Sequence, residues 1–164
     1  MFRIGEGYDV HALEDGRDLF LGCVRIESPR GPVGHSDGDA LAHAVCDALL
    51  GAAALGDIGR HFPPGDKRFK DVASRMFLEG ASRMVTESGY RVVNVDSTVI
   101  CEQPRLAPHI DSIREALASA IGCKVAQVSV KAKTAEGFGA VGEGHAIEAR
   151  AVALLESVGE RTGG

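Results

Sequence analysis

The residues of this chain best suited to chemistry are one carboxylate and two imidazoles, those of Asp9, His11 and His43. Asp9 and His11 are two positions apart, so they share one face if their strand-like segment continues through them. Zinc accepts imidazole nitrogen and carboxylate oxygen, and three protein ligands leave its fourth position open for a substrate. In the structural alternative, Asp9 only accepts a hydrogen bond from His11, and His43 is a surface residue.

A second polar cluster, His35-Ser36-Asp37-Gly38-Asp39, directly precedes the helical segment that contains His43. The N-terminus of a helix carries unpaired N–H groups and a partial positive charge, which could hold a phosphate. Asp37 and Asp39 are equally well explained as helix caps, and their charges would repel a bare phosphate. The cluster therefore indicates a phosphate site only if a cation lies nearby.

Two further segments have both a structural and a chemical interpretation. Asp57 and Gly59 form either a turn or a site for substrate hydroxyls. In Lys131-Ala132-Lys133-Thr134-Ala135-Glu136, the Thr134 hydroxyl could bind a phosphate and Glu136 could hold a hard divalent ion. The two lysines share one face, which could equally be a solvated one.

The composition limits the class of protein. A chain of 164 residues, 45% of them hydrophobic, can form one domain with a real core. A net charge of −5 and the absence of Trp disfavour a nucleic-acid partner. We expect no signal peptide and no membrane partner, because no apolar run is long enough to span a bilayer. Four scattered cysteines, without a C-x-x-C pair, are typical of reduced thiols in a cytoplasmic protein.

Hydrophobic patterns predict the elements that must position these residues. Strand patterns occupy residues 2–7, 19–26, 90–101, 125–134 and 145–158. Helical patterns occupy residues 38–55, 70–88 and 106–121. The first two strands are expected to form a β-hairpin around a turn at 14–18, and residues 28–32 to interrupt regular structure.

This order of elements predicts an α+β fold, a two-layer sandwich with a mixed sheet and helices on one side. Residues 1–159 are expected to form a single domain, and residues 160–164 a frayed C-terminal tail. Polar residues that interrupt the apolar strands indicate that the other face of the sheet meets another subunit.

Taken together, these segments resemble the 2-C-methyl-D-erythritol 2,4-cyclodiphosphate synthase family of the non-mevalonate isoprenoid pathway. The matching segments follow one another along nearly the whole chain: Gly7-Tyr8-Asp9-Val10-His11, His35-Ser36-Asp37-Gly38-Asp39 with His43, 47–59, Phe62-Pro63, Asn94-Val95-Asp96, Pro104, Pro108-His109-Ile110 and Val130-Lys131-Ala132. The resemblance implies a phosphorus-oxygen lyase that works as a homotrimer, with sheets packed around a threefold axis and active sites between subunits. The 2-phosphate of 4-diphosphocytidyl-2-C-methyl-D-erythritol 2-phosphate then attacks the β-phosphorus and expels CMP.

The resemblance also implies roles for individual residues. Asp9, His11 and His43 would bind Zn²⁺, and Glu136 would bind Mg²⁺ or Mn²⁺ bridging the substrate diphosphate. His35 and Thr134 would be catalytic, by stabilising the transition state. Substrate contacts are implied for Asp9, Val10, His11, His35, Ser36, Asp57, Ile58, Gly59, Phe62, Asp66, Cys101, Pro104, Arg105, Leu106, Ala107, Lys133, Thr134, Ala135 and Glu136.

The chain departs from the family pattern at three places. Glu143 replaces an arginine that many relatives place at the trimer axis, so isoprenoid diphosphates are not expected to bind there. Lys133 replaces a commoner Thr, and Pro64-Gly65 a commoner Asp-Thr. Two alternative functions stay open at this point: a zinc phosphohydrolase that activates water, and a non-catalytic trimeric binding module.

Overall fold

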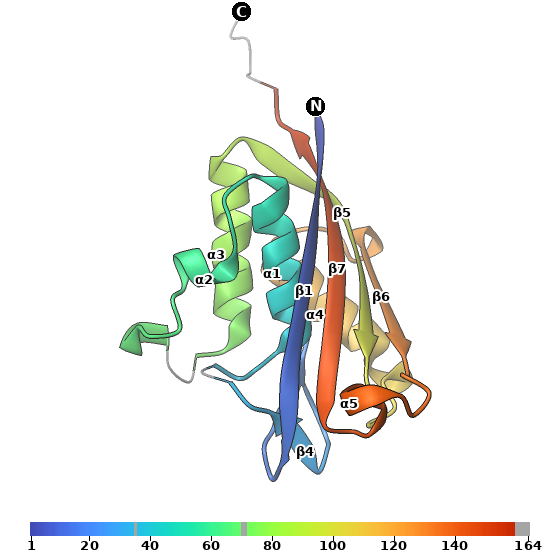
Figure 1. Ribbon diagram of the computed structural model, residues 1–164. Coiled ribbons are helices and arrows are strands. Elements are labelled where there is room, and N and C mark those ends of the chain that lie inside the picture. The colour runs from blue at the N-terminus through green and yellow to red at the C-terminus, as the bar shows by residue number, and fades with distance from the viewer. Residues whose placement is uncertain (35, 70–71, 160–164) are drawn as a thin grey trace, which may run out of the picture.

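The computed structural model describes residues 1–34, 36–69 and 72–159, and its centre is a five-stranded mixed sheet (Figure 1). The strand order is β4-β1-β7-β5-β6. In that order the strands are Arg30–Pro32, Phe2–Asp15, Ala146–Ser157, Tyr90–Ile100 and Val128–Lys133. β5 and β6 are parallel, and the other neighbouring strands are antiparallel. A separate two-stranded ribbon pairs β2 (Leu19–Leu21) with β3 (Val24–Ile26).

Three longer helices cover one face of the sheet: α1 (Ala40–Ala52), α3 (Ser74–Glu87) and α4 (Ile110–Ile121) (Figure 1). The short elements are α2 (Ile58–His61), α5 (Gly139–Gly142) and the 3₁₀ turns η1 (Lys67–Phe69), η2 (Ala107–His109) and η3 (Val125–Gln127). This arrangement confirms the predicted α+β class, with a mixed sheet and helices on one side. Within the described residues, no helix combines the length and the apolar character that crossing a membrane requires.

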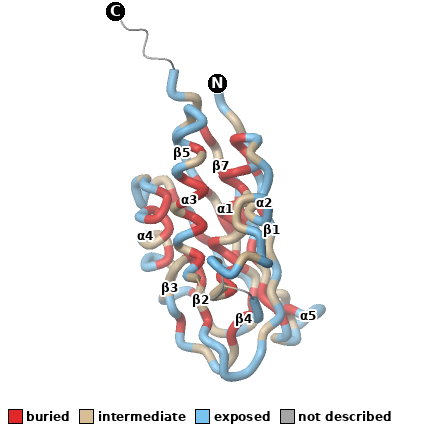
Figure 2. Tube along the Cα trace, turned by 90° about the vertical axis from the view of Figure 1, so that its left-hand side faces the viewer, coloured by how far each residue is buried: buried red, intermediate tan, exposed pale blue. Residues whose placement is uncertain are grey.

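The core lies between the sheet and the helices, where buried residues gather (Figure 2). On β7 every second residue from Ile147 to Leu155 is buried, and the three between them are alanines, which leave room for α1. On β1 the same role falls to Gly5 and Gly7. A Cβ at Gly7 would lie 2.0 Å from the carbonyl oxygen of Ala44, so only glycine allows this approach. This contact fixes where α1, and with it His43, lies relative to β1.

Gly7→Ala is therefore expected to destabilise the protein by about 3 kcal/mol or more, since the clash is with helix backbone that cannot rotate away. Urea unfolding measures this change. Gly51→Ala is the matched control, because a Cβ there meets its nearest neighbour, the Glu6 oxygen, at an ordinary 3.9 Å. It should be neutral or stabilising, because Ala favours a helix over Gly. Equal stability of the two variants would contradict the close-packing account.

The predicted β-hairpin between residues 2–7 and 19–26 is wrong. β1 continues to Asp15 and pairs with β4 and β7, while β2 and β3 pair with each other. Gly22 and Cys23, with φ angles of 56° and 67°, form the two-residue turn between β2 and β3. A two-residue turn with two positive φ angles matches the twist of a hairpin, so β2 pairs with β3, its neighbour in sequence, and not with β1.

Residues 28–32 were predicted to lack regular structure, but Arg30–Pro32 forms β4 on the sheet edge. A proline is tolerated there because an edge strand leaves some N–H positions unpaired. Helix α1 ends at Ala52 and not near Leu55, since Ala54 adopts a left-handed φ of 59°.

The other boundaries are closer to the predictions. β7 occupies most of segment 145–158, which was predicted as a strand, and α4 ends at Ile121 as expected. The predicted start of a helix at Lys70 lies outside the described residues, as do residues 160–164; the described helix α3 begins at Ser74. Met76, which belongs to the helical pattern predicted over residues 70–88, is 36% exposed.

Candidate functional site

Asp9, His11 and His43 converge between β1 and α1. Asp9 and His11 occupy alternate positions on the helix-facing side of β1, and His43 lies on α1 above them. Asp9 Oδ2 is 2.9 Å from both His11 Nε2 and His43 Nδ1, and the two nitrogens are 3.4 Å apart. One ligand atom from each residue lies within 4.8 Å of the others, so the three form a group that could hold a metal ion.

The electrostatics of this triad (Asp9, His11 and His43) favour a positive charge at its centre. Burial alone would raise the pKa of Asp9, but the hydrogen bonds from His11 and His43 outweigh it and lower that pKa to about 2. Burial alone would lower the pKa of His11, but the hydrogen bond and charge of Asp9 raise it overall. Asp9 is therefore an anion across the physiological range, facing two imidazoles.

The orientation of His11 supports a metal ion at this position. His11 Nδ1 is 2.8 Å from the carbonyl oxygen of Val33, which can only accept, so Nδ1 carries the hydrogen. In the neutral ring, Nε2 then points a lone pair at the Asp9 carboxylate. Two acceptors 2.9 Å apart repel unless a proton or a cation lies between them. Two imidazole nitrogens and one carboxylate oxygen form a ligand set that suits zinc.

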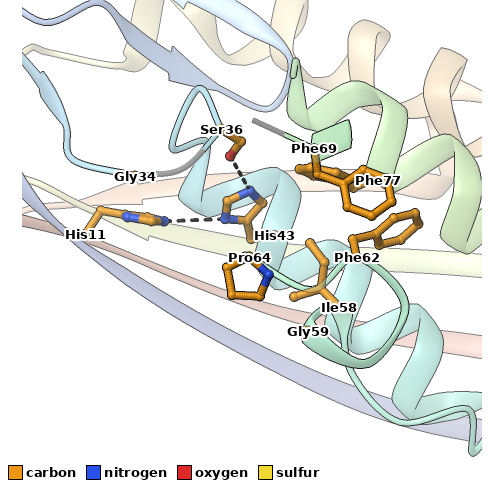
Figure 3. Close-up of a pocket in the computed structure, with 10 residues that line it drawn as sticks. All are labelled: His11, Gly34, Ser36, His43, Ile58, Gly59, Phe62, Pro64, Phe69 and Phe77. Carbon is orange, nitrogen blue, oxygen red and sulfur yellow. Dashed lines mark hydrogen bonds between the residues drawn. The ribbon is translucent and has the colours of Figure 1, made fainter. Parts of the chain in front are cut away.

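A pocket of about 320 Å³ opens beside the triad (Figure 3). Its polar side holds His11, Ser36 and His43, and its apolar side is largely aromatic. The residues of that apolar side are Ile58, Phe62, Pro64, Phe69 and Phe77. Phe62 and Phe77 lie with their ring centroids 5.0 Å apart. The pocket therefore suits a small ligand with an anionic group at the triad and a carbon skeleton against the aromatic rings.

A second pocket, of about 400 Å³, lies at the far edge of the sheet and holds a different part of the predicted site. It is lined by Cys101, Glu102, Gln103, Pro104, Arg105, Leu106, Ala107, Ala132, Lys133 and Thr134. Beside it, the Thr134 hydroxyl donates to Glu136 Oε1 at 2.7 Å. Glu136 has a left-handed φ of 52°, so its carboxylate is displayed from a tight turn after β6.

The two pockets are separate within one chain. The strand register places Asp9 opposite Ala149, Ala149 opposite Val99, and Val99 opposite Ala132. Three strand spacings of about 4.8 Å put the backbones of Asp9 and Ala132 about 14 Å apart. Glu136 follows Ala132 beyond the end of β6. The triad and Glu136 of one chain therefore do not meet across a single diphosphate, which spans only one bridging oxygen.

Several of the predicted site residues line neither pocket or lie outside the described residues. Val10 faces the opposite side of the sheet and is 46% exposed. Asp57 is exposed and caps α2 by accepting from the Arg60 N–H, and Asp66 forms an ion pair with Arg68. His35 lies outside the described residues. Ile58, Gly59 and Phe62 line the first pocket.

The sequence did not predict the residue that hydrogen-bonds to the triad from outside it. Ser74 is fully buried, and its hydroxyl is 2.8 Å from His43 Nε2. Asp39 caps α1, as one of the two predicted caps, whereas Asp37 binds Ser74 instead. A serine at the start of a helix is common for local reasons, so no sequence signal linked Ser74 to His43. The lining residue Phe69 was missed as well.

The four cysteines are free thiols, as the sequence predicted. Burial raises the pKa of Cys101 to about 11 and raises those of Cys23, Cys46 and Cys123 as well. Since the thiolate is the nucleophile and the metal ligand, these groups are poor candidates for either role at neutral pH. The chemistry therefore centres on imidazole and carboxylate groups.

Comparison with known proteins agrees with this geometry. The model of the YgbB family matches residues 2–156. A 2-C-methyl-D-erythritol 2,4-cyclodiphosphate synthase of Moorella thermoacetica is 56% identical over 153 residues, 93% of this chain and 94% of that protein. A solved synthase of the same name in a CDP-bound form is 39% identical and has a TM-score of 0.87. That match covers 94% of this chain and 100% of the solved one.

The bifunctional IspDF of Campylobacter jejuni is also similar, with 34% identity and a TM-score of 0.92. The match covers 96% of this chain but only 42% of IspDF, so this chain corresponds to less than half of that longer protein. The extent and identity of these matches lead to one assignment: the chain belongs to the YgbB family, the family of the 2-C-methyl-D-erythritol 2,4-cyclodiphosphate synthases.

Proposed function

We propose that this chain converts 4-diphosphocytidyl-2-C-methyl-D-erythritol 2-phosphate into 2-C-methyl-D-erythritol 2,4-cyclodiphosphate and CMP. An oxygen of the 2-phosphate forms a bond to the β-phosphorus, and the bond from that phosphorus to the oxygen shared with the α-phosphate breaks. The electron pair leaves with CMP. The observation that carries the proposal is the convergence of Asp9, His11 and His43 beside an apolar pocket, in a member of this family.

The triad is proposed to hold Zn²⁺, and Glu136 to hold Mg²⁺ or Mn²⁺ on the diphosphate. Nitrogen-rich ligands suit zinc, while a lone carboxylate beside phosphate oxygens suits a hard cation. Such ions supply positive charge that offsets the repulsion between two phosphates. The protein residues then align nucleophile and leaving group, which accounts for much of the rate in an intramolecular displacement.

The first pocket is proposed to bind the methylerythritol part of the substrate. Ile58 and Phe62 would contact its carbon skeleton, and Asp57 with the Gly59 backbone would bind its hydroxyls. Ser36, 3.4 Å from His43 Nε2, lies where it can donate to the 2-phosphate. His35 and Thr134 are proposed to donate to phosphate oxygens in the transition state, at which charge accumulates.

The second pocket is proposed to bind the cytidine. The segment from Cys101 to Ala107 lines it together with Lys133 and Thr134. The backbone of this segment is proposed to contact the base, and Lys133 and Thr134 to lie toward the diphosphate. A pocket formed largely by backbone can recognise a base edge through N–H and carbonyl groups. Lys133 supplies a positive charge there that the commoner Thr would not.

A complete site is proposed to need two copies of the chain. The triad and Glu136 lie near opposite edges of one sheet, so a neighbouring copy must supply the second pocket. The uncovered face of the sheet offers the contact surface, since Phe2, Ile4 and Tyr8 are 64%, 73% and 44% exposed there. Packing of these sheets around a threefold axis, in a homotrimer, would bury such residues and unite the two pockets.

Mixing two inactive variants tests this shared site. His43→Ala keeps the second pocket and Glu136→Gln keeps the triad, so every mixed trimer contains a single site with both intact halves. Equal co-expression should restore about a quarter of wild-type activity per site, the fraction expected from random assembly. Recovery no greater than the sum of the two separate variants would contradict a site shared between subunits.

Two substrates separate the proposed reaction from its alternatives. The first is the 2-phosphorylated compound, and the second is the same compound without the 2-phosphate. Cyclisation releases CMP only from the first, because the second lacks the nucleophile. A phosphohydrolase that activates water would release CMP from both, and a binding module would release it from neither.

A cytoplasmic location stays a prediction, which the four free cysteines support.

A further inference from the structure

We propose that Ser74 and Asp37 are positioning residues that fix the tautomer and ring orientation of His43, so that Nδ1 is its metal-binding atom. His43 is bonded through both nitrogens: Nδ1 lies 2.9 Å from Asp9 Oδ2, and Nε2 lies 2.8 Å from the Ser74 hydroxyl. That hydroxyl makes a short hydrogen bond to Asp37 Oδ1, and the Ser74 N–H donates to Asp37 Oδ2 at 2.9 Å. This inference rests on the metal site proposed above.

The direction of each hydrogen bond follows from the groups involved. A carboxylate has no hydrogen to donate, so the Ser74 hydroxyl must donate to Asp37. A hydroxyl has a single hydrogen, so toward His43 the Ser74 oxygen can only accept. His43 Nε2 therefore carries the hydrogen, and the lone pair of the neutral ring lies on Nδ1. Nδ1 is the nitrogen that faces Asp9 and His11.

The relay from His43 through Ser74 to Asp37 is held firmly in place. Ser74 is fully buried at the first residue of α3, and Ala73, the residue before the helix, offers no side-chain cap. Asp37 supplies that cap from another segment and also accepts from the Asp39 N–H at 3.2 Å. The same carboxylate thus begins α3 and orients His43. Ring rotation would break the bond to Ser74.

Ser36 carries a second hydroxyl near this nitrogen, and the geometry assigns it a lesser role. Its oxygen is 3.4 Å from His43 Nε2, against 2.8 Å for Ser74. Ser36 is also partly exposed and lines the pocket, where a substrate phosphate can compete for its hydroxyl. Ser74 is fully buried and free of that competition. Outer partners of this kind typically change metal affinity by about 10- to 100-fold.

The test measures zinc affinity and the His43 tautomer in the full-length protein. Ser74→Ala should weaken zinc binding about 10- to 100-fold, because it removes the hydroxyl that His43 contacts. Asp37→Asn should weaken zinc binding less than Ser74→Ala does, because the amide oxygen still accepts one of the two Ser74 hydrogen bonds. Ser82→Ala is the matched control. Ser82 is a buried serine on the same helix whose hydroxyl donates to the Ile121 carbonyl, remote from the triad, so zinc affinity should be unchanged.

Nitrogen-15 NMR of the zinc-loaded wild-type protein tests the same claim without any substitution. The expected result is a hydrogen on His43 Nε2 with the metal at Nδ1. A hydrogen on Nδ1 would overturn the proposal, as would wild-type zinc affinity in Ser74→Ala. Failure of the wild-type protein to bind zinc would instead refute the metal site itself, so the two failures are distinguishable.

Discussion

His43→Ala should abolish zinc binding and lower kcat/KM by about 10³-fold, equivalent to about 4 kcal/mol of lost transition-state stabilisation. Asp9 and His11 alone leave two ligands on the β1 side and none on α1. Two ligands are one fewer than catalytic zinc sites ordinarily have, so the ion should be lost on dialysis. Metal content and CMP release are the two measurements.

The same substitution should leave the fold intact. The His43 side chain lies at the pocket and is partly exposed, whereas the neighbouring Ala42 and Ala44 on α1 are fully buried. Removing the imidazole opens space toward the pocket and Phe77, and it removes no apolar side chain from the hydrophobic core. His145→Ala is the control, because within the described residues the side chain of this exposed histidine pairs with Glu143 alone. This variant should retain both zinc and activity. Full zinc retention in His43→Ala would contradict the assignment of this ligand.

Glu136→Gln should lower kcat by about 10²-fold or more and weaken the response to Mg²⁺, while zinc at the triad is retained. Gln keeps the size of the side chain, the left-handed backbone and an oxygen that can accept from Thr134. The substitution therefore removes a charge and leaves the turn unaltered. Glu115→Gln on the exposed side of α4 is a control for the loss of one negative charge. A magnesium titration identical to wild type would contradict the proposed role of Glu136.

The fold class was predictable because periodicity and turn residues are local signals. Tyr90–Ile100 alternates and α4 repeats helically, and both form as expected. β1 was harder to predict, since the polar residues Asp9 and His11 interrupt its apolar pattern. Its partners, β4 and β7, are set by long-range pairing that no local turn signal encodes.

The candidate site was predictable only in part, for a similar reason. Asp9 and His11 are two residues apart on one strand, so their shared face follows from strand geometry. The distance from this pair to Glu136 depends on the order of four strands, and only the register reveals it. The contact of Ser74 with His43 depends on how α3 begins against the loop before α1, and no pattern within either segment encodes it.

Phosphorus-31 NMR of the product is the most direct test of the proposed function. With 4-diphosphocytidyl-2-C-methyl-D-erythritol 2-phosphate as substrate, the reaction should yield CMP and two coupled resonances of a cyclic diphosphate. No linear phosphomonoester should accumulate, because the attacking oxygen belongs to the substrate. CMP accompanied only by linear methylerythritol phosphates would show that water is the nucleophile and would contradict the cyclisation.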